Sequence, residues 1–426
     1  MFFSEFRESD ARDSSAHDSR KHESHEETTN QYFRYRFGQY PNMKNWDFKL
    51  STRLISGAGS SRQLGRLARE QGFTRSLLVT DSGLADLGYL DRAANLLSDA
   101  GIQSFAFHDF ASDPDSAMIA GGSAFASPLN IDSIIAFGGG SSLDCAKGIN
   151  FLLTNGGRVH DYQGYGKASK PMLPMIAVPT TAGTGSEVQS YAVISDAETH
   201  RKMACGAPGA AFKLAILDPE LTLSQPRQVT AASGFDAIAH AVETYVATSR
   251  TPMSEMFSRQ AWRLLESNYE TVLRRPDDLS AREAMQLGAC WAGIAIENSM
   301  LGATHACANP LTAHYCITHG AALAMLLPSV VRWNGTVAAA RYAELLALAN
   351  IQVKGDPVET LAQRLEELAA SAGLVDGLSA AGVPVSDLPL LAAEAAQQWT
   401  GSFNPRPFDL QGALEVYESA SRSAGA

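Results

Sequence analysis

From Phe48 onward, short apolar runs alternate with longer polar and amphipathic segments. Four of these runs, residues 77–81, 131–137, 175–178 and 214–217, have the length and apolar content of buried strands. The first two are each followed by a turn and a helical segment. Strands that alternate with helices favour a parallel sheet with helices on its faces, so this part of the chain predicts an α/β domain.

The pattern changes near residue 224. Beyond Pro226 the strand-like runs cease, and alanine, leucine and glutamate dominate long helical stretches such as residues 338–348 and 358–372. We therefore expect an α/β domain over residues 46–224 and an all-helical domain over residues 225–426. No internal repeat is evident.

Residues 1–45 differ in composition from everything after them. They are rich in Ser, Glu, Asp, His and Arg, with only scattered aromatic residues, and cannot build a core. We predict a disordered polar tail, in which His17, His22 and His25 fit solvated side chains better than a metal site. The segment lacks the apolar stretch of a secretory signal, and its acidic residues argue against a mitochondrial one.

Composition narrows the class of protein. A chain of 426 residues with 45% hydrophobic residues can bury a sizeable core. The net charge of -11 and the lack of a basic stripe argue against a nucleic-acid partner. The apolar runs are far shorter than the ~20 residues that span a bilayer, so we expect no membrane partner. The five cysteines form no CxxC pair, which favours a reducing compartment, and we predict the cytoplasm.

Two loops that follow apolar strands suit a nucleotide. The first, Gly138-Gly139-Gly140-Ser141, opens a helix, so backbone N–H groups and the helix N-terminus can approach a pyrophosphate. The second, residues 179–187, reads PTTAGTGSE and offers hydroxyl groups and flexible backbone. A glycine-rich corner alone is often only a tight turn, and GxGxxG is absent. Two such loops at strand ends together indicate a dinucleotide.

Four residues of the second half are spaced as one divalent-metal site: Asp236, His240, His305 and His319. The first two are four residues apart in a helical stretch, so their side chains project from one face. The other two flank a segment in which Pro310 should end one helix and another should begin after Gly320, so a return of the chain could bring them together. One carboxylate and three imidazoles suit Fe²⁺ or Zn²⁺, which makes Cys307 and Cys316 bystanders.

Residues 46–420 resemble the iron-containing (group III) alcohol dehydrogenases. The similarity rests on GGGSSLDCAKGI, PTTAGTGSEV, the segment with Asp236 and His240, and GATHACANPLTAHYCITHG, with a weaker match at Asn404-Pro405-Arg406-Pro407. The resemblance implies a Rossmann-like α/β dinucleotide-binding domain with a parallel sheet, followed by an all-α helical domain, with the active site in the cleft between them. It also implies that the four spaced residues bind Fe²⁺, with Zn²⁺ as the alternative.

The same resemblance implies the cofactor contacts. Asp81 looks like the family's ribose-recognising acid, whose carboxylate would bind the ribose hydroxyls and repel a 2′-phosphate, which favours NAD over NADP. Lys202 looks like a family lysine that reaches the ribose. The other predicted cofactor residues belong to the two loops: Gly138, Gly139, Gly140, Ser141, Thr180, Thr181 and Thr184.

The implied reaction is reversible hydride transfer between a small alcohol and NAD, with a metal that holds the alcohol oxygen. Many relatives have a second histidine four residues after His305, where this chain has Asn309. An amide can hydrogen-bond a substrate or the cofactor, but it does not titrate near neutral pH and cannot relay a proton. The catalytic candidates are therefore Asn309, as a hydrogen-bonding group, and His314, which could replace the missing histidine. We predict that Asn309 marks a subgroup with a distinct substrate. Glu243, one turn after His240, is either a residue that orients a ligand or a solvated glutamate.

Three other functions are alternatives to this one. A dehydroquinate synthase-like enzyme needs cationic residues for an acidic phosphorylated substrate, and the histidine-rich segment has no evident Lys or Arg cluster. A maleylacetate reductase-like enzyme has less need for a metal, and a nucleotide-binding or filament-forming scaffold has no need for metal ligands. The presence of all four spaced ligands argues against both. We expect a small-molecule alcohol or aldehyde as substrate and a homodimer or larger homo-oligomer as the assembly.

Overall fold

The computed structural model describes residues 45–110, 113–374 and 377–422. The chain divides into two units, Met1–Asp47 and Phe48–Ala426. The helices and strands of the described residues all belong to the second unit. The predicted polar tail, residues 1–45, lies outside the described residues apart from Asn45.

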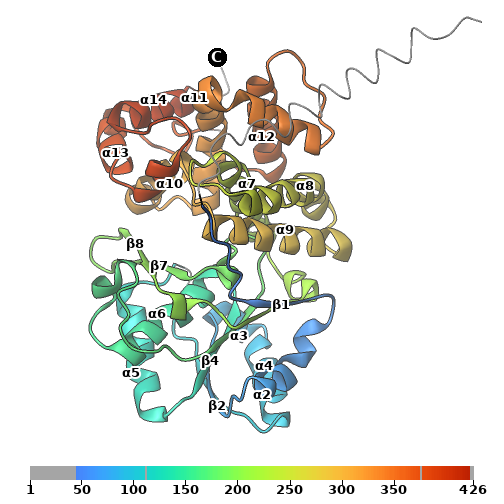
Figure 1. Cartoon of the computed structure of the whole chain (residues 1–426), viewed down its shortest axis with the longest axis vertical. Coiled ribbons are helices and arrows are strands. Elements are labelled where there is room, and N and C mark those ends of the chain that lie inside the picture. The colour runs from blue at the N-terminus through green and yellow to red at the C-terminus, as the bar shows by residue number, and fades with distance from the viewer. Residues whose placement is uncertain (1–44, 111–112, 375–376, 423–426) are drawn as a thin grey trace, which may run out of the picture. The chain divides into compact units, whose positions relative to one another are not determined.

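A six-stranded parallel sheet forms the centre of the first half of Phe48–Ala426 (Figure 1). Every pair of neighbouring strands is parallel, so the carboxyl ends of all six strands lie on one edge of the sheet. In spatial order, the strands are β1 (Arg53–Ser56), β9 (Leu214–Leu217), β6 (Met175–Pro179), β4 (Ser133–Gly138), β2 (Arg75–Val79) and β3 (Gln103–Phe107).

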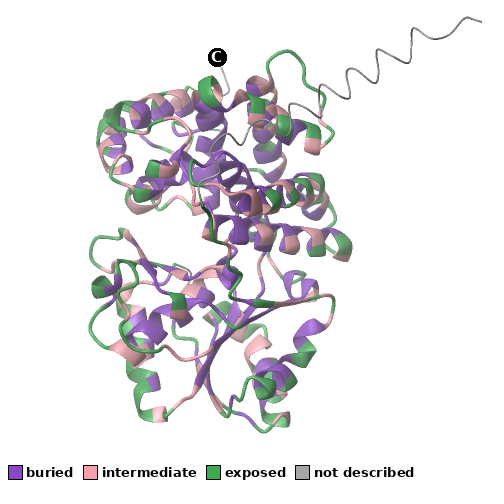
Figure 2. Cartoon of the chain, viewed as in Figure 1, coloured by how far each residue is buried: buried purple, intermediate pink, exposed green. Residues whose placement is uncertain are grey.

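The four central strands of this sheet are buried almost throughout (Figure 2). On β4, Ile134 and Ala136 belong to one apolar cluster, whereas Ile135 and Phe137 belong to another on the opposite face. Burial on both faces explains why the strands appear in the sequence as unbroken apolar runs. The first cluster includes side chains of α5 (Ser116–Ala126) and α6 (Gly140–Asn155), and the second includes those of α2 (Leu64–Glu70) and α4 (Tyr89–Asp99).

The four predicted strands are confirmed, although their ends shift by up to two residues. The run at residues 77–81 corresponds to β2, which ends at Val79, and the run at residues 131–137 corresponds to β4, which begins at Ser133. Asp81 therefore lies just beyond β2. There it caps the short helix α3 (Ser82–Asp86) by accepting a hydrogen bond from the backbone N–H of Leu84.

A second, three-stranded sheet was not predicted. Two of its three strands, residues 191–195 and 202–206, form an antiparallel pair, with Tyr191 opposite Gly206 and Ser195 opposite Lys202. In the sequences YAVIS and KMACG of this pair, buried residues alternate with more exposed ones, because each strand is only partly buried. In spatial order, the strands are β5 (Gly164–Tyr165), β8 (Lys202–Gly206) and β7 (Tyr191–Ser195).

Helices form the second half of the unit (Figure 1). The proposed domain boundary near residue 224 falls between the end of β9 at Leu217 and the first long helix, which begins at Arg227. One apolar cluster holds these helices together. Among the described helices, none combines the length and the apolar character that crossing a bilayer requires. They are α7 (Arg227–Val246), α8 (Pro252–Arg274), α9 (Leu279–Glu297), α10 (Ala303–Tyr315), α11 (His319–Leu348), α12 (Pro357–Ala372), α13 (Leu388–Ala395) and α14 (Leu410–Ser421).

Pro310 does not end a helix, so that expectation was wrong. Helix α10 continues through it to Tyr315, and α11 begins at His319 rather than after Gly320. A proline inside a helix removes one backbone hydrogen bond. Burial of Pro310 among the helices offsets this cost, and α10 ends instead where Cys316 adopts a left-handed conformation with φ of 53°.

Candidate active site

Asp236 and His240 lie one turn apart in the middle of α7, as their spacing predicted. Small neighbours such as Ala237 and Ala239 favour a helix here and allow other helices to pack closely on α7. Both polar side chains are buried within this packing, at 5% exposure each. His240 Nε2 lies 3.1 Å from Asp236 Oδ1.

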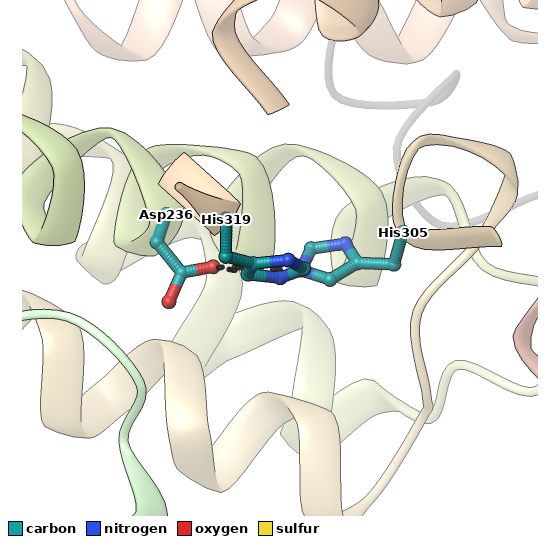
Figure 3. Close-up of side chains that lie close together, drawn as sticks. All are labelled: Asp236, His305 and His319. Carbon is teal, nitrogen blue, oxygen red and sulfur yellow. Dashed lines mark ion pairs between the residues drawn. The ribbon is translucent and has the colours of Figure 1, made fainter. Parts of the chain in front are cut away.

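Helices α10 and α11 bring two more histidines to the same carboxylate (Figure 3). His305 Nε2 lies 3.5 Å and His319 Nε2 lies 3.8 Å from Asp236 Oδ1. One ligand atom from each of these three residues lies within 4.8 Å of the other two. His240 joins the group by stacking on His305, with ring centroids 4.9 Å apart. The four residues that the sequence suggested as ligands are thus neighbours in the fold.

The polar atoms of this cluster fit a metal ion. Asp236 Oδ1 and His305 Nε2 are buried and have no hydrogen-bond partner among the described residues. Burying polar atoms without partners is costly, and a shared cation would satisfy both. Ligand atoms about 2.1 Å from a tetrahedral ion lie about 3.4 Å apart. The oxygen–nitrogen distances of 3.1, 3.5 and 3.8 Å bracket that separation.

The protonation states of the cluster follow from burial and mutual charge. Burial would raise the pKa of Asp236, but the imidazoles, above all His240, hold it well below its usual range. Burial would lower the pKa of His305, but the Glu243 and Asp236 carboxylates outweigh it and raise the pKa to about 9. Burial lowers the pKa of His319 to about 3. A metal at His305 Nε2 would therefore replace a proton that the ring otherwise holds.

Glu243 fixes the orientation of His305. Its Oε2 lies 2.5 Å from His305 Nδ1, and its Oε1 accepts a hydrogen bond of 2.6 Å from the backbone N–H of Thr304. The bond to Nδ1 leaves Nε2 directed toward Asp236. Glu243 is only 3% exposed, so the solvated glutamate that the sequence left open is excluded.

Asn404, in the stretch Asn-Pro-Arg-Pro, supports the start of α10. Its Oδ1 accepts hydrogen bonds from the backbone N–H of Ala303 at 3.2 Å and from Asn334 Nδ2 at 3.1 Å. Gly302 lies between two supports, since an added Cβ would lie 3.0 Å from Asn404 Oδ1 and 3.1 Å from Glu243 Oε1. Sequence reasoning assigned Asn404 no role, because these partners are 101 and 70 residues away.

The two glycine-rich loops pack directly on each other. Strand β4 ends at Gly138 and helix α6 begins at Gly140. An added Cβ at Gly139 would lie 3.0 Å from Thr181 Cγ2, and one at Gly140 would lie 2.5 Å from Thr184 Cγ2. Glycine at position 140 is therefore required by the close approach of the second loop. Together the loops form one surface at the carboxyl edge of the sheet.

A buried lysine that sequence analysis did not single out links the second loop to α6 and β7. Lys147 Nζ donates hydrogen bonds to the carbonyl and hydroxyl oxygens of Ser186, both at 2.8 Å, and to the carbonyl of Tyr191 at 2.6 Å. Its charge faces Asp144, 3.7 Å away, which also accepts a bond of 2.6 Å from the Ser186 hydroxyl. Burial lowers the pKa of Lys147. Its position three residues after Asp144, in the otherwise small and apolar stretch Cys-Ala-Lys-Gly-Ile, is the signal that could have identified it.

One cavity joins the histidine cluster to the loops. Its volume is about 1590 Å³, and residues from both the α/β half and the helical half line it. It lies where the resemblance placed the active-site cleft. The predicted site residues that line it are Gly140, Ser141, Thr184, Lys202, Asp236, His240, His305, Asn309 and His319.

Six predicted residues do not line this cavity: Asp81, Gly138, Gly139, Thr180, Thr181 and His314. Asp81 is connected to the first loop, because its Oδ2 accepts a hydrogen bond of 3.2 Å from the Ser142 hydroxyl. The backbone N–H of Thr180 donates to the carbonyl of Gly138, which joins the second loop to the first. His314 is exposed, and its Nε2 lies 2.9 Å from Glu394 Oε2. The fold therefore does not bring His314 to the other predicted residues.

Lys202 lies beside the first loop. Its Nζ is 3.2 Å from Asp113 Oδ1, and the backbone N–H of Asp113 donates to the Ser141 hydroxyl at 3.1 Å. The ammonium group holds the pKa of Asp113 below its usual range. Lys202 thus provides a positive charge at the cavity wall next to the N-terminus of α6.

Comparison with known proteins gives two family matches, one in each half of the chain. The family model described as "Iron-containing alcohol dehydrogenase" matches residues 51–219, and that described as "Fe-containing alcohol dehydrogenase family, C-terminal" matches residues 230–421. NAD-dependent methanol dehydrogenase of Bacillus methanolicus is 33% identical over 370 residues, which cover 86% of this chain and 97% of that protein.

Two further relatives are named for a diol. The 1,3-propanediol dehydrogenase of Klebsiella pneumoniae is 32% identical, over 85% of this chain and 96% of that protein. The crystal structure of a 1,3-propanediol oxidoreductase superposes with a TM-score of 0.85 at 31% identity, and covers 88% of this chain and 100% of that one. The similarity thus extends over both halves of the fold.

Proposed function

The chain belongs to the iron-containing alcohol dehydrogenase family, and we propose that its cavity is the site of NAD-linked alcohol oxidation at a bound metal. As a member of this family, it is an oxidoreductase that interconverts an alcohol and its aldehyde or ketone. The proposal for the site rests on one observation. Asp236 Oδ1 and His305 Nε2, which are buried and accept or donate no hydrogen bond within the described part of the chain, lie beside a cavity that the glycine-rich loops also line.

The four clustered side chains would hold the metal: Asp236, His240, His305 and His319. We propose Fe²⁺, in line with the family's name, with Zn²⁺ as the alternative that the same ligands suit. Bound there, the ion supplies Lewis-acid chemistry that lowers the pKa of an alcohol oxygen. Glu243 would keep His305 Nε2 directed inward.

The two loops would position the dinucleotide. Backbone N–H groups at the N-terminus of α6 would bind the pyrophosphate, and Lys202 and Asp81 would bind ribose hydroxyls. The hydroxyl groups of the second loop would complete the contacts. The loop residues assigned this role are Gly138, Gly139, Gly140, Ser141, Thr180, Thr181 and Thr184.

Asn309 would hold a hydrogen bond in the cavity rather than move a proton. It lines the cavity one turn after His305, and its amide does not titrate near neutral pH. His314 is left out of the proposed site, because its ring pairs with Glu394 outside the cavity.

Elemental analysis combined with turnover tests the proposal. We expect about one metal ion per chain, and NADH formation from a small primary alcohol that is lost on chelation and restored by Fe²⁺ or Zn²⁺. His305→Ala should remove metal and turnover together, whereas His314→Ala should retain the metal. Full activity in metal-free protein would refute the metal-dependent site.

Assembly and compartment belong to the same proposal. We propose a homodimer or larger homo-oligomer, which light scattering on the purified protein would test. The five cysteines are all unpaired thiols, and four of them are buried, which supports our proposal of a reducing compartment such as the cytoplasm.

A further inference from the structure

The wall of the cavity beyond the histidine cluster contains a pair of amides. Asn309 follows His305 by four residues in α10, so the two side chains project from the same face of the helix. Their Cβ atoms are about 5–6 Å apart at this spacing. Both residues line the cavity, so Asn309 offers a polar group on the same helix face as the proposed metal ligand.

Gln398 completes the pair. It precedes the short 3₁₀ helix η8 (Trp399–Phe403) and also lines the cavity. Asn309 Nδ2 donates a hydrogen bond of 3.1 Å to Gln398 Oε1. No hydrogen bond to another described residue uses Asn309 Oδ1 or Gln398 Nε2. If both amides are turned round, the pair still bonds internally and still leaves one acceptor and one donor.

The segment that carries Gln398 is held in place by packing. The Trp399 ring lies against Tyr191 of β7, with centroids 5.7 Å apart, and edge-on to Phe403 at 5.8 Å. Gln398 is thus bonded to α10 on one side, while the next residue packs on the α/β half. The adjacent Thr400 also lines the cavity, and its hydroxyl is buried without a partner among the described residues. This part of the wall therefore has polar groups that are fixed in position but incompletely satisfied.

Apolar side chains line the cavity close by in the sequence. Ile296, Met300 and Leu301 precede α10 and line the same cavity. Such a wall accommodates a short carbon chain, whereas the amide pair requires a hydrogen-bonding group.

We propose that Asn309 and Gln398 are specificity-determining residues that select alcohols with a second hydrogen-bonding group, such as a short diol, over plain alkanols. This inference rests on the proposed function, since it takes the reacting oxygen to lie at the histidine cluster. A hydroxyl both donates and accepts, so it can bond to the free acceptor and the free donor of the pair at once. A methyl group in its place would leave the free acceptor and the free donor of the pair without a partner, which is a strong basis for rejecting a substrate.

Comparing a diol with the matching alkanol tests this proposal. With metal-loaded enzyme and NAD, kcat/KM for 1,3-propanediol should exceed that for 1-propanol by about tenfold or more, the effect of two ordinary hydrogen bonds. Gln398→Met keeps the length of the side chain but removes its hydrogen bonds, and should reduce the ratio to about one. Asn309→Leu should do the same. Gln411→Met makes the identical change at an exposed position of α14 outside the cavity and should leave the ratio as it is.

Calorimetric titration of each alcohol into the enzyme–NADH complex provides a readout without turnover. The diol should bind about tenfold more tightly than the alkanol, and Gln398→Met should abolish the difference. Equal kcat/KM values for the two alcohols in the wild type would overturn the inference. So would a diol preference that stays unchanged in both Gln398→Met and Asn309→Leu. If the loaded wild-type enzyme oxidised neither alcohol, the proposed function would fail instead, while the binding preference would still decide the role of the amides.

Discussion

Replacing Glu243 by glutamine should weaken metal binding while leaving the protein folded. The carboxylate now serves two groups, the backbone N–H of Thr304 at 2.6 Å and His305 Nδ1 at 2.5 Å. Glutamine has the same size but only one acceptor oxygen. If that oxygen stays on Thr304, the amide nitrogen donates to His305 Nδ1. The proton of the neutral ring must then lie on Nε2, the atom that faces Asp236.

The size of the effect follows from burial. Glu243 is 3% exposed, so water cannot replace the lost acceptor. A hydrogen bond to a charged group contributes about 1.5–3 kcal/mol, which corresponds to about a 10- to 100-fold loss of metal affinity. The opposite amide orientation keeps the ring proton on Nδ1 but sets two N–H groups against each other at Thr304, at a similar cost.

Competition between the metal-stripped protein and a chromophoric chelator for Zn²⁺ measures this loss. Glu266→Gln is the matched control, because Glu266 is a buried carboxylate of α8 that pairs with Arg364 at 2.9 Å outside the cavity. It should bind Zn²⁺ as the wild type does. If Glu243→Gln also bound Zn²⁺ with wild-type affinity, with both variants folded by circular dichroism, the orienting role of Glu243 would be refuted.

Three further predictions concern the cofactor half. Lys147→Met should lower the free energy of unfolding by about 3–5 kcal/mol and weaken NADH binding, because it leaves the largely buried Asp144 carboxylate without its cation. Chemical denaturation and NADH fluorescence measure the two effects. Gly140→Ala should weaken NADH binding about tenfold, since the new Cβ would lie 2.5 Å from Thr184 Cγ2. The control Gly121→Ala, at an open helical position, should leave the folding stability unchanged or raise it by about 0.5–1 kcal/mol. Equal NADH affinities for the two variants would contradict this prediction. Burial raises the pKa of Glu187 from its ordinary 4.5 to about 6. Its contribution to folding stability is therefore full below pH 4.5, and about 2 kcal/mol of it is lost as pH rises through 6. Thermal unfolding measured across that pH range should show this decline in the wild type and not in Glu187→Gln.

The large sheet could be predicted because its signal is local. Each central strand is buried on both faces, so the apolar runs at residues 131–137 and 175–178 indicate β4 and β6 with little interference. Strand β7 alternates between buried and exposed positions over only five residues, and its partner β8 is equally short. Such short, half-buried strands leave too weak a pattern in the sequence to separate from loops.

The candidate site divides in the same way. Asp236 and His240 were predictable because a helix places residues four apart on one face. The contacts that orient the site were not, since Glu243 and His305 are 62 residues apart, and Asn309 and Gln398 are 89 apart. Such pairs depend on how the helices pack, which spacing along the chain does not encode.

The turn that joins His305 to His319 shows how a sound conclusion can rest on a wrong local reason. A break at Pro310 was expected to return the chain, yet α10 continues through it and the turn occurs after Tyr315, at Cys316. The two histidines meet because α10 and α11 are consecutive helices joined by a short link. Any sharp connection between them would have sufficed.

Helix α10 is positioned largely by side chains outside it. Its cap residue Gly302 has no side chain to bind the first N–H groups, and Pro310 removes a hydrogen bond from its interior. Asn404 and Glu243 accept the bonds of the first two N–H groups, and the Tyr417 hydroxyl of α14 donates to a carbonyl of α10 at 2.6 Å.

This support has a consequence for catalysis. The same helix carries a proposed metal ligand, His305, and a proposed substrate contact, Asn309, so their separation is fixed by helix geometry. The supports from α7, α14 and the segment at Asn404 then set where both groups lie relative to Asp236. Reacting groups must be held within a fraction of an ångström for efficient transfer. Residues remote from the cavity therefore contribute to the geometry of the reaction through the placement of one helix.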